Sequence, residues 1–254
     1  MTLNAEAVLA LHPDLVFVTK QSNSAEMLGR LGLNVETVEF SDFKGLIGTI
    51  DQTAALLGTD LAKTQAEHYG KAFSALDERQ PVAAHPPRIL HIASFAPLTV
   101  DGEGTIIDEW IRDAGGLNAA TGLHGNKRPV SLEQILSWAP DLIILGADAG
   151  EPDPAQGSGL WSRLAAVQHG RVFRNPAGVF NWDRYSPELL LQRIWARDLV
   201  RTGSVDRPQM IKKIRDFYRD FYRHPIDQDD AVRILNAKPP LPEKCSGVTD
   251  EVGK

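Results

Sequence analysis

The sequence has little of what would mark a disulfide framework, a metal cluster or a membrane span. Its one cysteine, Cys245, can form neither an intrachain disulfide nor a multi-cysteine zinc or iron–sulfur site. No apolar run approaches the roughly 18 residues that a transmembrane helix requires. Acidic side chains outnumber basic ones by 33 to 27, and the resulting net charge of −6 argues against binding nucleic acid through its phosphates.

Sequence motifs of enzyme chemistry are also missing. The chain has no His-Glu-x-x-His zinc motif, no P-loop and no Gly-x-Ser-x-Gly nucleophile elbow. Gly102 and Gly104 lack the third glycine of a dinucleotide fingerprint. His91, within an expected strand, and His169, beside a turn, are interpreted as structural or solvated. We therefore expect a protein that is not an enzyme, with no catalytic residues, no metal ligands and no cofactor.

What the sequence does contain is an internal repeat, in which residues 4–18 match residues 131–145 at an offset of 127. Each copy predicts a short helix, a Pro-Asp pair that ends it, and an apolar run. Asn4 and Ser131 are suitable N-caps for the two helices. The apolar runs predict strands buried on both faces, as in a parallel sheet. The repeat therefore predicts an α/β fold with two lobes and parallel-type sheets.

The remaining pattern predicts how the lobes are completed and joined. Each repeat strand is followed by a polar loop, a helix (25–32 or 160–167) and a second strand (35–38 or 171–173). Further helices are expected over 43–57, 60–79, 105–114, 187–201 and 207–223, and a strand over 88–94 with a loop through Gly104. The predicted domains are a partial N-terminal lobe (1–58), an interlobe helix (59–80), a C-terminal lobe (81–235) and a disordered tail (236–254).

The strongest candidate for a binding site is the segment Asn-Trp-Asp-Arg-Tyr at 181–185. We expect Ser186 to cap the following helix, whose positive N-terminus, together with the guanidinium of Arg184, suits anionic oxygens. Trp182 and Tyr185 are expected to supply flat apolar walls. The alternative is that Trp182 packs under the helix and Arg184 pairs with the neighbouring Asp183.

Two other positions are expected to face the same site. Phe95 follows a strand at its carboxyl end, where α/β folds hold ligands, and Lys127 and Arg128 lie just before the second repeat. Loop core for Phe95 and a solvated basic turn for the pair are the alternatives. The predicted ligand-binding residues are Phe95, Lys127, Arg128, Trp182, Arg184 and Tyr185.

These features together resemble the metal-chelate family of substrate-binding proteins of ABC importers. The resemblance spans residues 4–235 and rests on the paired repeat units, the long connecting helix, Gly115-Gly116-Leu-Asn118 followed by Ser131-x-Glu133, and the run 181–187. The family takes up ferric siderophores, haem and cobalamin, with relatives for other metal species and oxyanions. It implies a class III-like protein with two lobes and a ligand in the cleft between them. It places cleft residues in the loops of Phe95, of Lys127 and Arg128, and of 182–185.

The resemblance also implies a location and a partner. A member of this family is periplasmic or membrane-anchored on the extracytoplasmic side, and it serves iron transport or a related uptake by docking, as a monomer, on an ABC permease of the inner membrane. Because family members carry about half a lobe and an export signal before the segment matching Asn4, we expect the first lobe to be truncated. The alternatives are an oxyanion (molybdate-like) binder of the same fold, an interaction module using helix 207–223, and a nitrogenase-like α/β enzyme subunit, whose cysteine ligands are missing.

Overall fold

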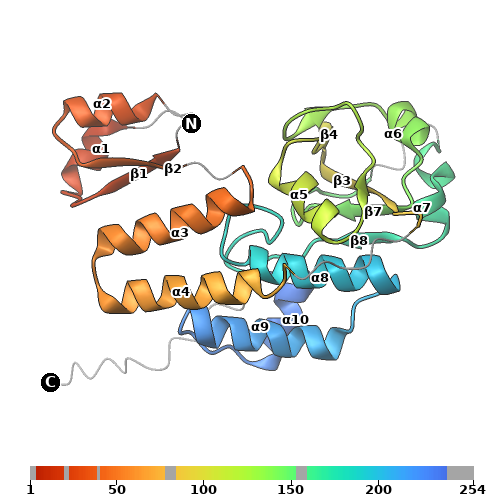
Figure 1. Ribbon diagram of the computed structural model, residues 1–254. Helices are drawn as coiled ribbons and strands as arrows, with labels where there is room; N and C mark the ends of the chain where they lie inside the picture. The colour runs from red at the N-terminus through yellow and green to blue at the C-terminus, as the bar shows by residue number, and fades with distance from the viewer. Residues whose placement is uncertain (1–3, 20–22, 39–40, 78–83, 153–158, 239–254) are drawn as a thin grey trace, which may run out of the picture. The chain divides into compact units, whose positions relative to one another are not determined.

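The chain divides into two compact units, residues 1–71 and residues 72–254, with the boundary inside a helix. The computed structural model describes residues 4–19, 23–38, 41–77, 84–152 and 159–238, and Figure 1 shows their helices and strands. Within these residues no helix is long and apolar enough to cross a bilayer. The tail predicted to be disordered lies outside the described residues from 239 onward.

The first unit contains a parallel pair of strands, two short helices and two longer ones. Strand β1 (Val16–Thr19) pairs with β2 (Val35–Val38). The helices are α1 (Ala5–Ala10), α2 (Ser24–Arg30), α3 (Phe43–Leu57) and the first part of α4 (Asp60–Ser74). The prediction that β1 is buried on both faces is wrong: its residues alternate between half-buried and exposed, and Phe17 is 41% exposed. A sheet of two described strands is too small to be covered on both faces.

The second unit is built around a mixed sheet. Its strands are β3 (Arg88–Phe95), β4 (Leu98–Val100), β5 (Leu117–Asn118), β6 (Arg128–Pro129), β7 (Leu142–Leu145) and β8 (Val172–Arg174). They run in the order β6-β4-β3-β7-β8, with β5 beside the start of β3. Strands β3, β5, β7 and β8 pair in parallel, whereas β4 is antiparallel to β3 and β6 is antiparallel to β4. The predicted loop through Gly104 therefore contains an additional strand, because the chain reverses after Phe95 and pairs with β3 again.

Helices complete the second unit (Figure 1). They are α5 (Ile106–Asp113), α6 (Leu132–Trp138), the 3₁₀ helix η1 (Trp161–Arg163), α7 (Ala165–Gln168), α8 (Leu189–Thr202), α9 (Arg207–Phe221) and α10 (Gln228–Leu235). The predicted helix 160–167 is interrupted at Leu164, whose backbone is extended. The predicted helix 60–79 ends earlier, at Ser74, because hydrogen bonds to Phe73 and Ser74 from residues three positions later tighten its last turn.

The internal repeat is present in the backbone geometry of both units. The side chain of Asn4 caps α1 and that of Ser131 caps α6, as predicted. The chain leaves α1 through His12, with a φ of 46°, and α6 through Ala139, with a φ of 45°. These two residues occupy equivalent places directly before the shared proline. The two copies therefore use the same left-handed helix exit, which is uncommon for residues other than glycine.

A buried arginine connects three segments of the second unit. Arg193 of α8 is 1% exposed and donates to both carboxylate oxygens of Asp113, at the end of α5, at 3.1 and 2.8 Å. It also donates to the carbonyl oxygen of Phe73, at 2.7 Å, and to Asp77, at 2.8 Å. Arg197, one turn later, donates to the same Asp113 at 3.0 and 2.6 Å. This cluster fixes α8 to α5 and to the end of α4.

Replacing Arg193 by Met should destabilise the protein by about 1.5 to 3 kcal/mol, because the Phe73 carbonyl loses its donor and Asp113 keeps only Arg197. Urea denaturation followed by circular dichroism measures this change. The control is Arg201→Met, which removes a 70% exposed cation paired with Asp198 and should cost at most about 1 kcal/mol. Equal effects of the two substitutions would contradict a structural role for the cluster.

Candidate functional site

A buried carboxylate lies where three chain segments meet in the second unit. Asp101 directly follows β4 and has a fully buried side chain. It accepts hydrogen bonds from Arg184 Nη2 at 2.9 Å and Nη1 at 3.3 Å, and from the backbone N–H of Lys127 at 2.9 Å. Its Oδ2 also lies 2.8 Å from Nδ1 of His91, on β3. Asp101 therefore connects the strand, the loop before β6 and the loop before α8.

A second carboxylate approaches the same histidine from its other side. Asp183 Oδ2 lies 2.8 Å from His91 Nε2, and Arg184 Nε lies 3.7 Å from that same oxygen. The side chains of His91, Asp101 and Asp183 are at most 1% exposed, and that of Arg184 is 15% exposed. We call these four side chains the buried ion network. Two carboxylates and two cations give it no net charge when all are ionised.

The electrostatics of the buried ion network favour its ionised form. Burial by itself disfavours the imidazolium of His91, but Asp101 and Asp183 outweigh burial and raise the pKa of His91 above its usual value. Burial also opposes the charge of Asp101, but His91 and Arg184 hold the pKa of that carboxyl well below its usual range. The charged forms of His91 and Asp101 therefore stabilise one another within the network.

The guanidinium of Arg184 has more partners than the sequence predicted. Its two terminal nitrogens bond Asp101, and its Nε also forms the predicted ion pair with the adjacent Asp183, at 3.7 Å. Arg184 Nη1 also reaches Asn126 Oδ1 at 3.4 Å, and the amide of Asn126 donates to the hydroxyl of Tyr185 at 3.5 Å. The structure thus brings Arg184 and Tyr185 together with the loop that contains Lys127.

Lys127 and Arg128 present positive charge beside this group. Lys127 has a φ of 51°, and its backbone N–H is fixed by Asp101, whereas its side chain and that of Arg128 are exposed. Among the described residues no ion pair is formed by either side chain. Four of the six predicted site residues are therefore clustered.

The other two predicted residues lie differently. Trp182 is fully buried, in agreement with the alternative that it packs under the helix, so it offers no accessible wall. The half-buried ring of Phe95 packs edge-on against Trp161, with 5.4 Å between ring centroids, and its contacts are to the core beneath β3 and β7. The predicted cap at Ser186 is wrong: Ser186 accepts from the N–H of Glu188 in a turn, and α8 begins only at Leu189.

The sequence did not predict the buried carboxylate of Glu188, which holds the loop at Val179 and Phe180. Glu188 is fully buried and accepts hydrogen bonds from the backbone N–H of Val179 at 3.3 Å, the N–H of Phe180 at 2.9 Å and the hydroxyl of Tyr218 at 2.7 Å. A Cβ at Gly178 would collide with the Glu188 carboxylate and the Tyr218 hydroxyl. The bonds fix a loop tip on which Val179 is 71% and Phe180 is 53% exposed.

Asp101 was not predicted as part of the site, and His91 was interpreted only as structural or solvated; its burial agrees with the structural interpretation. His91 interrupts the apolar stretch in the middle of β3, and a polar group buried in a sheet requires a partner. The partner could not be found from sequence because the turn that returns Asp101 to β3 was interpreted as a loop.

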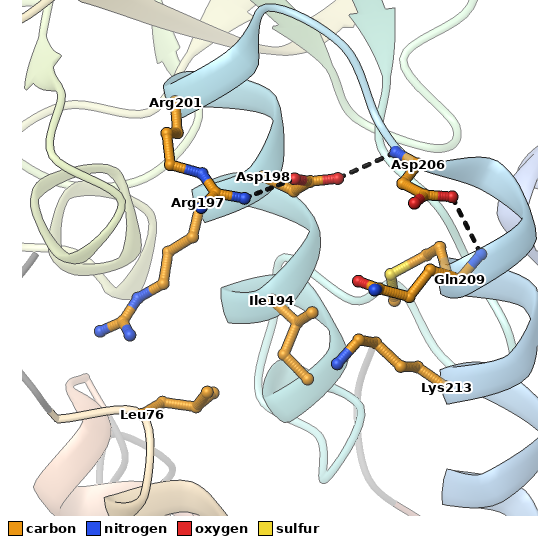
Figure 2. A pocket seen from close by; sticks show the side chains of 9 residues that line it. Leu76, Ile194, Arg197, Asp198, Arg201, Asp206, Gln209 and Lys213 are labelled. Atoms are coloured by element: carbon orange, nitrogen blue, oxygen red, sulfur yellow. Dashed lines mark hydrogen bonds and ion pairs between the residues drawn. The ribbon is translucent and has the colours of Figure 1, made fainter.

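Pockets elsewhere in the second unit do not include the predicted site residues. Figure 2 shows one of about 190 Å³ between α8 and α9, where Arg201 binds Asp198 and Asp198 accepts from the backbone N–H of Asp206. Another, of about 600 Å³, lies along α5 and is lined by Arg88, Glu103, Gly104, Asp108, Arg112, Leu117, Asn118, Thr121 and His124. Neither of these two pockets is lined by Arg184 or by another residue of the candidate site.

Replacing Asp101 by Asn should destabilise the protein by about 3 to 5 kcal/mol at pH 7, because it leaves the buried cations His91 and Arg184 with one carboxylate. The stabilisation by Asp101 should be present above its unfolded pKa, about 3.9, and be lost as the pH falls through its lower folded value. Urea denaturation at several pH values tests both points. The control is Asp148→Asn, at an exposed residue bonded to Asn181, which should cost about 1 kcal/mol or less.

Comparisons with known proteins agree with this architecture. The molybdate-binding protein MolA of Haemophilus influenzae is 26% identical over 91% of this chain and 73% of its own length. The vitamin B12-binding protein of Salmonella typhimurium is 28% identical, and the match covers 59% of this chain and 57% of that protein. The crystal structure of MolA bound to molybdate superposes with a TM-score of 0.74 at 24% identity, covering 89% of this chain and 77% of that one.

The structural likeness confirms the predicted fold class, an α/β fold with two lobes. The model of a family described as periplasmic binding protein matches residues 1–178, which is well over half of the chain. The chain therefore belongs to the periplasmic binding protein family, as the resemblance in its sequence predicted.

Proposed function

We propose that this chain is the substrate-binding component of an ABC importer and that it binds a metal-containing anion without chemical turnover. The observation that carries the proposal is the positive charge beside the buried ion network. The side chains of Lys127 and Arg128 are exposed without an ion pair in the described part of the chain, and the partly exposed Arg184 lies next to them. Exposed cations at the start of the edge strand β6 suit an anionic ligand. That the relatives are named as binding proteins supports binding without turnover.

A tetrahedral metal oxyanion of the molybdate type is the first candidate for the ligand. Its support is the likeness to the molybdate-binding protein, which extends over 91% of this chain. A small oxyanion needs several donors in a short space, and lysine, arginine and tyrosine side chains provide them here. The sequence resemblance alone implied an iron chelate as the first candidate, so we propose the two ligand classes in the opposite order.

A metal chelate such as a ferric siderophore, haem or a corrinoid is the second candidate. The exposed Val179 and Phe180 favour it, because an organic chelate offers apolar surface that an oxyanion lacks. The likeness to a vitamin B12-binding protein adds support. In either case the proposed protein is a monomer in the periplasm, or anchored to the membrane on that side, and delivers its ligand to a permease of the inner membrane.

Arg184→Lys should weaken ligand binding roughly ten- to a hundredfold, or about 1.5 to 3 kcal/mol, although the charge is retained. Lysine cannot form the two parallel bonds to Asp101 that hold the guanidinium in place. Calorimetric titrations with molybdate, cyanocobalamin and haemin identify the ligand class and measure the loss. Arg201→Lys is the control. A lower melting temperature with an unchanged Kd would mean that Arg184 only stabilises the fold.

Replacing Lys127 and Arg128 together by Ala should weaken binding about fivefold per charge at low ionic strength, because an exposed charge near the ligand contributes about 1 kcal/mol. The loss should shrink as salt screens the interaction. Titrations with the same probes at 20 mM and 500 mM NaCl check this. A double variant that binds as tightly as the unaltered protein at low salt would remove the observation that carries the proposal.

A further inference from the structure

Both ring nitrogens of His91 face a carboxylate. Nδ1 lies 2.8 Å from Asp101 Oδ2, and Nε2 lies 2.8 Å from Asp183 Oδ2. A neutral imidazole has one N–H and one lone pair, so one carboxylate oxygen would face a lone pair at hydrogen-bonding distance. Two ionised carboxylates at these distances require the doubly protonated ring.

The charge of Asp183 depends on that proton. Asp183 is 1% exposed, and among the described residues neither of its carboxylate oxygens meets a donor in hydrogen-bond geometry, so the 2.8 Å approach of Oδ2 to His91 Nε2 is a charge contact. Besides His91, its ion-pair partner among the described residues is Arg184, whose Nε lies 3.7 Å away and whose terminal nitrogens bond Asp101. If His91 lost its proton, the network would carry a net negative charge away from water, which is costly.

The same proton is linked to the candidate site through Asp101. That carboxylate bonds Arg184 and the backbone N–H of Lys127 as well as His91. We propose that His91 is a positioning residue: its protonated ring holds Asp101 and Asp183 in the arrangement that fixes Arg184 and the Lys127 backbone for ligand binding. The link to affinity rests on the proposed function, whereas the link to Arg184 does not.

The surroundings of His91 define how this arrangement responds to pH. The charged groups that face it are Asp101 after β4, and Asp183 and Arg184 before α8. From α5 it meets the uncharged ring of Trp110, with 6.1 Å between ring centroids, and β7 beside it is entirely aliphatic. Because the pKa of His91 is raised from its unfolded value of about 6.5, its stabilisation is complete below that value and is lost as the pH rises through the folded pKa.

The first measurement needs no ligand. Nitrogen-15 NMR of the His91 ring should show both nitrogens protonated at pH 7, and the exchange of the Arg184 Nε proton should accelerate as that signal titrates away. Asp183→Asn removes one carboxylate and retains the shape of the side chain. In this variant the pH at which His91 loses its proton and the pH at which Arg184 exchange accelerates should both fall by about one unit or more. His169→Gln, at an exposed histidine distant in sequence from the network, should leave both unchanged. A neutral His91 ring at pH 7, or Arg184 exchange that ignores its titration, would overturn the proposal.

The second measurement uses molybdate, with cyanocobalamin as the alternative probe. Affinity should fall about tenfold per pH unit above the titration midpoint of His91, as expected for one linked proton. The midpoint should again be lower in Asp183→Asn. Affinity that is independent of pH across this titration would overturn the role of His91 in binding. If neither probe binds at any pH while Arg184 still responds to His91, the proposed ligand class fails and the positioning role stands.

Discussion

The second unit's candidate site depends on one carboxylate that is withdrawn from water. Asp101 can be buried because a histidine, an arginine and a backbone N–H are directed at it, and each of these comes from a different segment. Its own position depends on the return of the chain along β3, where the N–H of Asp101 bonds the His91 carbonyl at 3.3 Å. The side chain of Asn118 donates to the Asp101 carbonyl at 3.3 Å and fixes the turn further. The pairing of the chain with β3 therefore fixes Asp101, and Asp101 in turn fixes the loop that carries the exposed Lys127.

The second unit contains another group of buried charges, the cluster around Arg193, which joins different segments. The cluster around Arg193 connects helices, and one of its members, Asp77, is 64% exposed. The buried ion network connects loops, and its histidine and carboxylates are almost fully excluded from solvent. Buried ion pairs contribute little net stability relative to apolar packing, but removing one partner is costly. Such clusters therefore specify a single arrangement of the segments that they join.

The sequence was informative where a short segment determines its own structure. The caps Asn4 and Ser131, the buried strand β7 and the boundaries of α3 all follow from local patterns, and the structure has them. The family resemblance was sound for the same reason, since it rested on the order of these local units. Burial of β1 was wrongly predicted because burial depends on neighbours and not on the strand alone.

The site was less predictable because its contacts join residues that are distant in sequence. Arg184 and Asp101 are 83 positions apart, and no local pattern indicates that pair. Nearness in sequence correctly indicated the ion pair between Arg184 and Asp183, at 3.7 Å, but not the shorter approach of that carboxylate to His91, at 2.8 Å. Trp182 and Arg184 were placed together on a helix start that lies further along the chain. Trp182 is thus fully buried, whereas Arg184, two residues later, is partly exposed and bonded to Asp101.

The bonds from Glu188 to the loop tip affect the conformational entropy that ligand binding would cost. A mobile apolar loop would lose conformational freedom whenever it closed on a ligand, and that loss would subtract from affinity. Here the two N–H groups of the tip are already bonded to a buried carboxylate, and the space beneath Gly178 is filled by the same carboxylate and by the Tyr218 hydroxyl. Most of the ordering is completed during folding. Val179 and Phe180 are thus presented as a rigid apolar projection, whose shape is set before any ligand arrives.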